Sequence, residues 1–328
     1  MTILRTGVIG VGHLGAIHAR LWKGTQNAQL VGVFDPDHNR AQAIAAEHGV
    51  LAFGTMDELL AAVDAVSIVA PTSEHARIAH AAIAAGVHCF IEKPITAQFA
   101  EAVAVIDHAN QAGITLQVGH VERFNPAFLA LAGYPLEPTF IESHRLAQFK
   151  PRATDVAVVL DLMIHDIDLI LHIVKSPVTE VRASGVAVVT STIDIANARI
   201  EFANGCVANI TASRISQRPM RKLRMFQRDA YISLDFAKPS VEIFRITDDP
   251  TATGTLSLGE LDLGESRRTI LFDQPTMPQV NAIQMELQTF TDAILHGGAP
   301  PVTATDGAEA LRIAELIINT IEAKGSNQ

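Results

Sequence analysis

The sequence predicts an α/β plus α+β protein: a first domain built on a doubly wound parallel sheet, then a domain with an open antiparallel sheet covered by helices. Its 328 residues exceed the size at which a single hydrophobic core usually keeps growing. The hydrophobic pattern changes near residue 123, from short apolar runs between helical stretches to longer runs of alternating polarity. We therefore expect domains at residues 1–122 and 123–328.

The first domain contains short apolar runs with amphipathic helical stretches between most of them. Strands and helices that alternate in this way form βαβ units and a parallel sheet. The predicted strands are 7–10, 30–35, 50–53, 65–70, 88–92 and 114–118.

The second domain has the alternating polarity that is typical of antiparallel strands with one buried face. The predicted strands are 139–146, 178–189, 193–202, 207–213 and 231–236. Helices at 156–174 and 280–296 are expected to cover this sheet, and a final helix at 305–323 to return toward the first domain. Segment 248–264 is rich in Asp, Thr and Gly, which predicts the most mobile loop.

Composition excludes several classes of protein. With 48% hydrophobic and 18% charged residues the chain is that of an ordered globular protein. Its net charge of −10 disfavours binding to nucleic acid or to anionic membranes. Cys89 and Cys206 show neither metal-ligand spacing nor a disulfide framework, and we expect no export signal and no transmembrane segment. A cytoplasmic location is expected.

A glycine-rich turn follows the first predicted strand and opens a helix. Gly10, Gly12 and Gly15 form GxGxxG, in which the first glycine permits the turn, the second lets a pyrophosphate approach the backbone, and the third allows close packing. His13 and Leu14 lie within the motif and join the candidate cofactor-binding residues, although a histidine on such a helix is more often a surface or packing residue. A chance cluster of glycines is the alternative.

Asp35 ends the second predicted strand, twenty residues after Gly15. An acidic side chain at this point of a Rossmann domain accepts hydrogen bonds from the adenosine ribose hydroxyls. Asp35 and Asp37 would repel a 2′-phosphate, and Arg40 is the only nearby cation, so NAD is favoured over NADP. The alternative for Asp35 is a turn residue before Pro36.

Two further groups of residues carry chemistry. The fifth strand ends in Glu92, Lys93 and Pro94 at the carboxyl edge of the sheet, and Glu92 and Lys93 are candidate cofactor-binding residues. A lysine there could stabilise a developing alkoxide; a solvated lysine is the alternative. In the helix at 156–174, four polar side chains fall at i, i+4, i+7 and i+11 and are expected to share one face: Asp161, His165, Asp168 and His172. Asp161 could orient His165 as a general base. A hydrogen-bonded core network is the alternative, and we expect no metal.

These motifs, in this order, resemble the Gfo/Idh/MocA oxidoreductases along the whole chain. The resemblance implies a Rossmann domain, NAD as cofactor, a C-terminal open sheet used for dimer or tetramer assembly, and Lys93, Asp161 and His165 beside the nicotinamide. It also implies that Pro71, Thr72 and His75 lie close to the nicotinamide ribose, although Thr72 or Ser73 could instead cap a helix.

Four segments are similar to bacterial dehydrogenases that oxidise the 3-hydroxyl of UDP-N-acetylglucosamine in lipid A precursor synthesis: VGHVERFNPAF, DLMIHDIDLIL, ARIEFANGCVANITASR and RDAYISLDF. The likeness implies oxidation of a sugar hydroxyl by hydride transfer to NAD between the domains. A dehydrogenase of a free sugar or inositol is the alternative, and a dinucleotide-binding regulator without turnover is a third reading. Arg123 is a candidate substrate-binding residue, but Arg123 and Asn125 could simply tie the domains together.

A cationic run lies at 214–228 in a chain of net negative charge. We expect one or two of its side chains, Arg214 above all, to bind the diphosphate of a nucleotide sugar, because guanidinium groups bind phosphate oxygens bidentately. Asp168 is a further candidate substrate-binding residue. The alternative is that most of the run is a solvated or subunit-facing strand edge.

Overall fold

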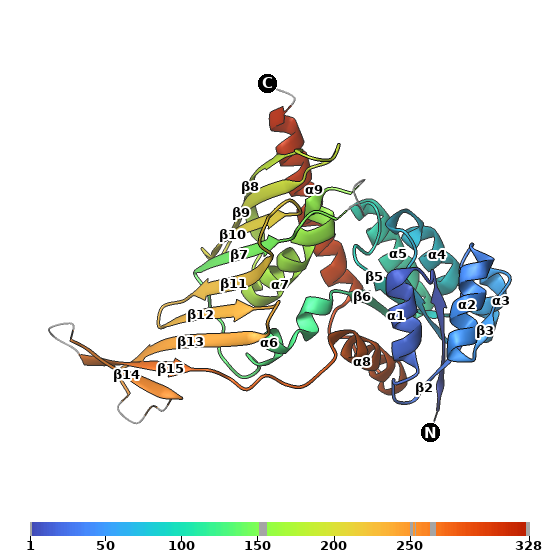
Figure 1. Cartoon of the computed structure of the whole chain (residues 1–328), viewed down its shortest axis with the longest axis horizontal. Coiled ribbons are helices and arrows are strands. Elements are labelled where there is room, and N and C mark those ends of the chain that lie inside the picture. The colour runs from blue at the N-terminus through green and yellow to red at the C-terminus, as the bar shows by residue number, and fades with distance from the viewer. Residues whose placement is uncertain (1, 151–155, 250–251, 253, 263–266, 326–328) are drawn as a thin grey trace. The chain divides into compact units, whose positions relative to one another are not determined.

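The computed structural model describes residues 2–150, 156–249, 252, 254–262 and 267–325, and the chain forms two compact units (Figure 1). Unit 1 comprises Met1–Phe124 and Val280–Arg312, and unit 2 comprises Asn125–Gln279 and Ile313–Gln328. The first boundary lies close to the expected one. The segment after Gln279 differs from expectation, because the chain returns there to unit 1.

Unit 1 is built on a six-stranded sheet of order β3-β2-β1-β4-β5-β6, and every neighbouring pair in it is parallel. This is the order of the doubly wound dinucleotide-binding fold. The strands are β1 (Leu4–Ile9), β2 (Ala28–Phe34), β3 (Leu51–Ala52), β4 (Ala65–Ile68), β5 (His88–Glu92) and β6 (Leu116–Gly119). The parallel sheet and its six strands are confirmed.

Helices cover both faces of this sheet. Neighbouring residues of a strand point to opposite faces, and Val8 packs with residues of α1, α2 and α8, whereas a Cβ on Gly7 would meet Leu59 of α3. The helices of the unit are α1 (His13–Trp22), α2 (His38–His48), α3 (Met56–Ala62), α4 (Thr72–Ala84), α5 (Phe99–Ala112) and α8 (Ala282–His296), with the 3-10 turn η1 (Val121–Phe124). The prediction that the helix at 280–296 covers the second sheet is wrong: Leu287 and Phe290 of α8 pack in the core of unit 1.

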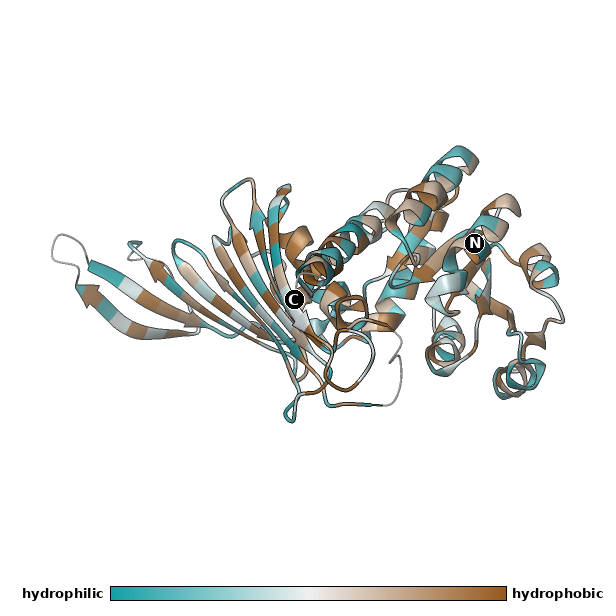
Figure 2. Cartoon of the chain, turned by 90° about the horizontal axis from the view of Figure 1, so that it is seen from above, coloured by the Kyte–Doolittle hydropathy of each residue, from teal (hydrophilic) through white to brown (hydrophobic). Residues whose placement is uncertain are grey.

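Unit 2 is built on a nine-stranded sheet of order β14-β15-β13-β12-β11-β7-β10-β9-β8. Its pairs are antiparallel except β7 with β10, which are parallel, so the predicted antiparallel sheet is confirmed in the main. The strands are β7 (Phe140–Leu146), β8 (Val178–Val186), β9 (Ile195–Phe202), β10 (Val207–Ser213), β11 (Met220–Phe226), β12 (Ala230–Asp235), β13 (Ser240–Thr247), β14 (Leu256–Asp262) and β15 (Arg267–Asp273). Hydrophobic and hydrophilic residues alternate along them (Figure 2).

The prediction of a mobile loop at 248–264 is wrong for the part of this segment that forms β14. Residues 250, 251, 253, 263 and 264 of that segment lie outside the described residues. β14 pairs with β15, and the register shifts between Ser257 and Gly259, which has φ +123°. Hydrogen bonds to the partner strand therefore override a local composition that is typical of turns. Gly259 adopts the positive φ that the register shift requires.

A buried ion pair attaches the polar helix to the second sheet. The segment forms a π-helical turn, η2 (Val159–Met163), followed by α7 (Ile164–Val174). On α7, Asp166 accepts from Arg145 Nε at 2.6 Å and from Ser143 Oγ at 2.7 Å, and both donors belong to β7. Removing one partner of such a pair costs about 3–5 kcal/mol, so it fixes the helix in register with the sheet.

The last helix, α9 (Ala304–Gly325), contributes to both units. In unit 1, the backbone N–H of Val118 donates to Val302 just before it. In unit 2, Lys324 Nζ donates to the carbonyl of Ala183. The short helix α6 (Pro126–Leu129) opens unit 2. Among the described residues, no helix is both long and apolar enough to span a membrane.

Candidate active site

The glycine turn between β1 and α1 is shaped by contacts that exclude side chains. Gly10 has φ +84°, and a Cβ there would lie 2.8 Å from the backbone of Ala70. A Cβ on Gly15 would collide with the carbonyl oxygen of Gly10. Gly12 is different, because a Cβ there would meet no protein atom within 4 Å, although the residue is the N-cap of α1. The space above Gly12 is therefore open to a ligand at the helix N-terminus, where anions are favoured.

A groove of about 600 Å³ extends from this turn along the ends of β1, β2 and β4. Asp35 is 4% exposed and accepts from the backbone N–H groups of Val11 and Asp37, so it both shapes the turn and presents its carboxylate to the groove. Arg40 lies 3.5 Å from Asp35 and 3.4 Å from Asp37. The single guanidinium of Arg40 thus faces two carboxylates. Their excess negative charge disfavours binding of the 2′-phosphate of NADP. The open glycine, the helix N-terminus and this acidic end fit a dinucleotide such as NAD.

Glu92 ends β5 in a chain of buried hydrogen bonds. The indole N–H of Trp22 can only donate, and it donates to Ser67 Oγ at 2.8 Å. Ser67 Oγ lies 3.2 Å from Nδ1 of His18, and Nε2 of His18 lies 3.1 Å from Oε1 of Glu92. The other carboxylate oxygen accepts from the backbone N–H of Lys93. Residues of α1 and β4 thereby hold Glu92, the residue that precedes Lys93, in place.

Burial acts to raise the pKa of Glu92, but the hydrogen bond and charge of His18, followed by the charge and backbone N–H of Lys93, outweigh it and lower that pKa. The carboxylate has room because the neighbour in β6 is Gly119, where a Cβ would lie 2.9 Å from Glu92 Oε1. A negative charge is therefore held beside Lys93.

His75 joins the end of β4 to the turn after Lys93. It is 1% exposed, and its ring nitrogens lie 2.9 Å from the carbonyl oxygens of Pro94 and Ala70. Burial lowers the pKa of His75.

Pro71, whose side chain makes no cap hydrogen bond, is the N-cap of α4, so the alternative of a cap at Thr72 or Ser73 is wrong. The peptide bond between Lys93 and Pro94 is cis.

In unit 2 the four polar residues do not lie on one uninterrupted α-helix, because Asp161 belongs to the π-helical turn. The one-residue expansion of the backbone hydrogen-bond spacing there alters the regular α-helical spacing that was expected. Asp161, His165 and His172 are half-buried and Asp168 is 1% exposed. His172 packs edge-on against Phe128 at 5.9 Å between ring centroids. The four polar residues therefore include structural residues as well as candidate catalytic ones.

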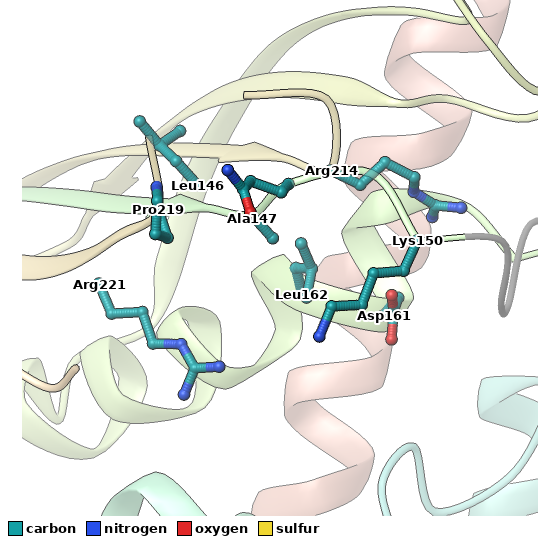
Figure 3. Close-up of a pocket in the computed structure, with 9 residues that line it drawn as sticks. Leu146, Ala147, Lys150, Asp161, Leu162, Arg214, Pro219 and Arg221 are labelled. Carbon is teal, nitrogen blue, oxygen red and sulfur yellow. The ribbon is translucent and has the colours of Figure 1, made fainter. Parts of the chain in front are cut away.

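A pocket of about 270 Å³ lies beside Asp161 (Figure 3). Its polar lining consists of Asp161, Gln148 and three cations, Lys150, Arg214 and Arg221. Arg214 is 5% exposed, donates to the carbonyl of Val156 and lies 3.9 Å from buried Asp194. Arg123, the remaining candidate, is buried in η1 of unit 1.

Comparison with known proteins identifies the chain. The family model for the oxidoreductase family with an NAD-binding Rossmann fold matches residues 4–120, and that for the GFO/IDH/MocA C-terminal domain matches residues 136–232. The UDP-N-acetylglucosamine 3-dehydrogenase of Acidithiobacillus ferrooxidans is 48% identical over 74% of this chain and 78% of its own length. This chain belongs to the Gfo/Idh/MocA family.

Two further comparisons of this Gfo/Idh/MocA protein are informative. The solved structure of the UDP-N-acetylglucosamine 3-dehydrogenase GnnA from Acidithiobacillus ferrooxidans has a TM-score of 0.88 and 39% identity, covering 98% of this chain and 99% of that one. The NAD-dependent scyllo-inositol 2-dehydrogenase of Bacillus subtilis is 26% identical over 97% of this chain and 94% of its own length. The predicted family, the NAD-binding Rossmann domain and the assignment as an NAD-dependent dehydrogenase are confirmed.

Sequence reasoning missed several residues of this family member's site. His18, Ser67 and Trp22 were not among the predicted site residues, although a histidine one turn after GxGxxG was a usable signal. Lys150 was also missed. The roles of the predicted site residues stay predictions: Gly10, Gly12, His13, Leu14, Gly15, Asp35, Pro71, Thr72, His75, Glu92, Lys93, Arg123, Asp161, His165, Asp168 and Arg214. The groove of unit 1 brings together Gly10, Gly12, Asp35 and Pro71, whereas His13 is exposed at the start of α1.

We expect Gly12→Ala to fold normally and to weaken NAD binding. The new methyl meets no protein atom but occupies the space through which the pyrophosphate approaches the backbone. Calorimetry should show the Kd for NAD raised by at least about tenfold, with little change in Tm. Gly15→Ala is the contrasting variant, because its methyl collides with Gly10 and should destabilise the fold. Unchanged NAD affinity in Gly12→Ala would contradict this assignment of the groove.

We expect His18→Leu to reverse the effect of pH at Glu92. With its partner lost, burial raises the pKa of Glu92 above its usual 4.5, so the folded state holds a proton that the unfolded chain releases. Stability should then fall as pH rises, whereas the lowered pKa in the original chain gives stability that is present above 4.5 and lost in acid.

The measurement is denaturant unfolding between about pH 5 and about pH 7.5. His18→Leu is compared with the double variant His18→Leu/Glu92→Gln, since both lack the imidazole and only one has the carboxyl. The stability of the single variant should decline relative to the double variant as pH rises, by about 1–3 kcal/mol. Parallel pH profiles would show that His18 does not hold the charge on Glu92.

Proposed function

We propose that this protein oxidises the 3-hydroxyl of UDP-N-acetylglucosamine to a ketone, with NAD as the hydride acceptor. The observation that carries the proposal is the likeness to GnnA, which extends over 98% of this chain at 39% identity. The four segments singled out in the sequence support the same substrate, and with it a role in lipid A precursor synthesis. Inositol dehydrogenases are more distant relatives, at 26–27% identity over almost the whole chain.

The proposed chemistry assigns a role to each of three side chains. NAD, when bound in the groove of unit 1, supplies a nicotinamide ring that accepts hydride. His165 removes the proton from the sugar hydroxyl, as a general base. Asp161 holds the imidazole in one orientation and stabilises its protonated form. Lys93 donates a hydrogen bond to the oxygen as negative charge develops on it.

Glu92 is not assigned a proton-transfer step. Its carboxylate already accepts hydrogen bonds from His18 and from the backbone of Lys93, and a lowered pKa keeps it charged. Its bond to the backbone N–H of Lys93 fixes the strand end from which the lysine extends. Glu92 therefore acts in this proposal as a positioning residue.

We expect Lys93→Ala and His165→Ala to bind NAD nearly as well as the original enzyme, while the rate of UDP-N-acetylglucosamine oxidation falls by about 10²-fold to 10⁴-fold. Single-turnover formation of reduced cofactor measures the chemical step, and calorimetry measures NAD binding. His172→Gln is the matched control on the same helix, since His172 packs on Phe128. Good turnover of myo-inositol or a free sugar, with no UDP-sugar oxidised, would refute the proposed substrate.

We also propose that two copies of this chain associate through the open face of the nine-stranded sheet. Five half-buried aromatic rings form a row across that face, with centroids 4.9–5.9 Å apart: Phe140, Phe226, Tyr231, Phe244 and Phe272. They lie on the face opposite to Ser143 and Arg145, which hold α7. A partly exposed aromatic row is typical of an interface.

We expect light scattering to give a dimer or tetramer for the original chain and a smaller species for Tyr231→Glu, which places a charge in the middle of the row. Glu242→Gln is a matched control, because Glu242 is exposed on the same face but outside the aromatic row. A monomeric original chain, or an unchanged assembly in Tyr231→Glu, would rule out this interface.

A further inference from the structure

We infer that Arg221 and Lys150, rather than Arg214, form a binding site for the diphosphate group of the substrate. The inference deepens the proposed function and rests on it. It begins from the pocket of about 270 Å³ beside Asp161, which three cationic side chains of the described chain line. Unit 2 alone contributes this lining.

Strand geometry sorts the cations of β11 into two sets. Side chains alternate between the faces of a strand, and Leu223 and Met225 are buried in the core of unit 2. Arg221 therefore points to that same face, at the end where the pocket lies. Lys222 and Arg224 point to the opposite, open face, where Lys222 lies 3.7 Å from Asp235 and Arg224 lies 2.7 Å from Glu142. Of the basic residues in β11, only Arg221 lines the pocket.

Arg214 has a structural role that its sequence position did not reveal. Its guanidinium donates to Val156 and lies 3.9 Å from Asp194. Burial acts to raise the pKa of Asp194, but the backbone N–H groups of Val188, Val189 and Thr190 with the Thr190 hydroxyl outweigh it, and the pKa is strongly lowered. A carboxylate that stays charged in this way fixes Arg214. Arg214 is buried and its guanidinium is engaged by contacts inside the protein.

Lys150 and Arg221 also bring positive charge to the lining of the pocket. Both residues are exposed, and Figure 3 shows their side chains extending toward each other from opposite sides, with Asp161 beside Lys150 and the head group of Arg214 beyond Lys150. A guanidinium binds two phosphate oxygens at once, and an ammonium binds as a point charge. The pair is complementary to a diphosphate, which carries negative charge on both phosphoryl groups.

The location makes this a specificity site for the proposed reaction. Asp161, the residue proposed to orient His165, lines the same pocket. A diphosphate held there lies near the proposed catalytic base, so its binding energy can position the attached sugar for oxidation. A free sugar or inositol has no group that would use these cations.

The test compares Arg221→Ala with Lys222→Ala, its neighbour on the same strand. Both remove one positive charge, but only Arg221 lines the pocket. We expect Arg221→Ala to raise the KM for UDP-N-acetylglucosamine and the Kd for UDP by about 10-fold to 100-fold, and Lys222→Ala to change them by less than about twofold. Lys150→Ala should act in the same direction as Arg221→Ala, and both effects should shrink at high salt. Equal effects of Arg221→Ala and Lys222→Ala, or none, would overturn the site.

Binding of inorganic pyrophosphate, measured by calorimetry on the NAD-loaded enzyme, separates this inference from the proposed function. If UDP-N-acetylglucosamine is a good substrate but pyrophosphate and UDP bind Arg221→Ala as they bind the original enzyme, the diphosphate site is wrong and the function stands. If no UDP-sugar is oxidised but pyrophosphate binding depends on Arg221, the proposed substrate is wrong and the anion site stands.

Discussion

The buried ion pair between Asp166 and Arg145 is the constraint on which the chemistry of unit 2 depends. It joins α7 to the middle of the nine-stranded sheet, and Ser143 adds a second bond to the same carboxylate. Asp161 and His165 lie on the same helical segment as Asp166, so their positions relative to the strands are set by this contact. A buried carboxylate without its arginine would strongly destabilise the fold. The ion pair therefore allows only one register of α7 on the sheet.

A different device positions Lys93 in unit 1. The side chain belongs to the turn after a central strand, and its conformation depends on what fixes the residues on either side. Glu92 is held by His18, and through Ser67 by Trp22, while His75 contacts the carbonyl of Pro94. In the hydrogen bond between Trp22 and Ser67, Trp22 must be the donor, because an indole nitrogen can only donate. Buried polar chains that are satisfied in this way make a site rigid before any ligand binds.

Both units place charge by using strand ends and strand alternation. In unit 1 the glycine turn, Asp35 and Lys93 all follow strands of one parallel sheet, so they share its carboxyl edge. In unit 2 the alternation along β11 sends Arg221 into a pocket and Lys222 to the opposite face. A cationic run that is continuous in sequence is thus divided between a ligand site and surface ion pairs.

The sequence by itself determined what depends on neighbours in the chain: the parallel domain, the GxGxxG turn with Asp35, the Glu92-Lys93-Pro94 strand end and the polar helix with Asp161 and His165. Each of these is a short segment whose periodicity or spacing carries the signal. The partners of His18 are 49 and 74 residues away, so no local pattern could reveal them. The same holds for the return of α8 to unit 1, for β14 within an expected loop, and for the burial of Arg214. Tertiary structure decided these features because strand register and burial, not spacing along the chain, determine which distant side chains meet.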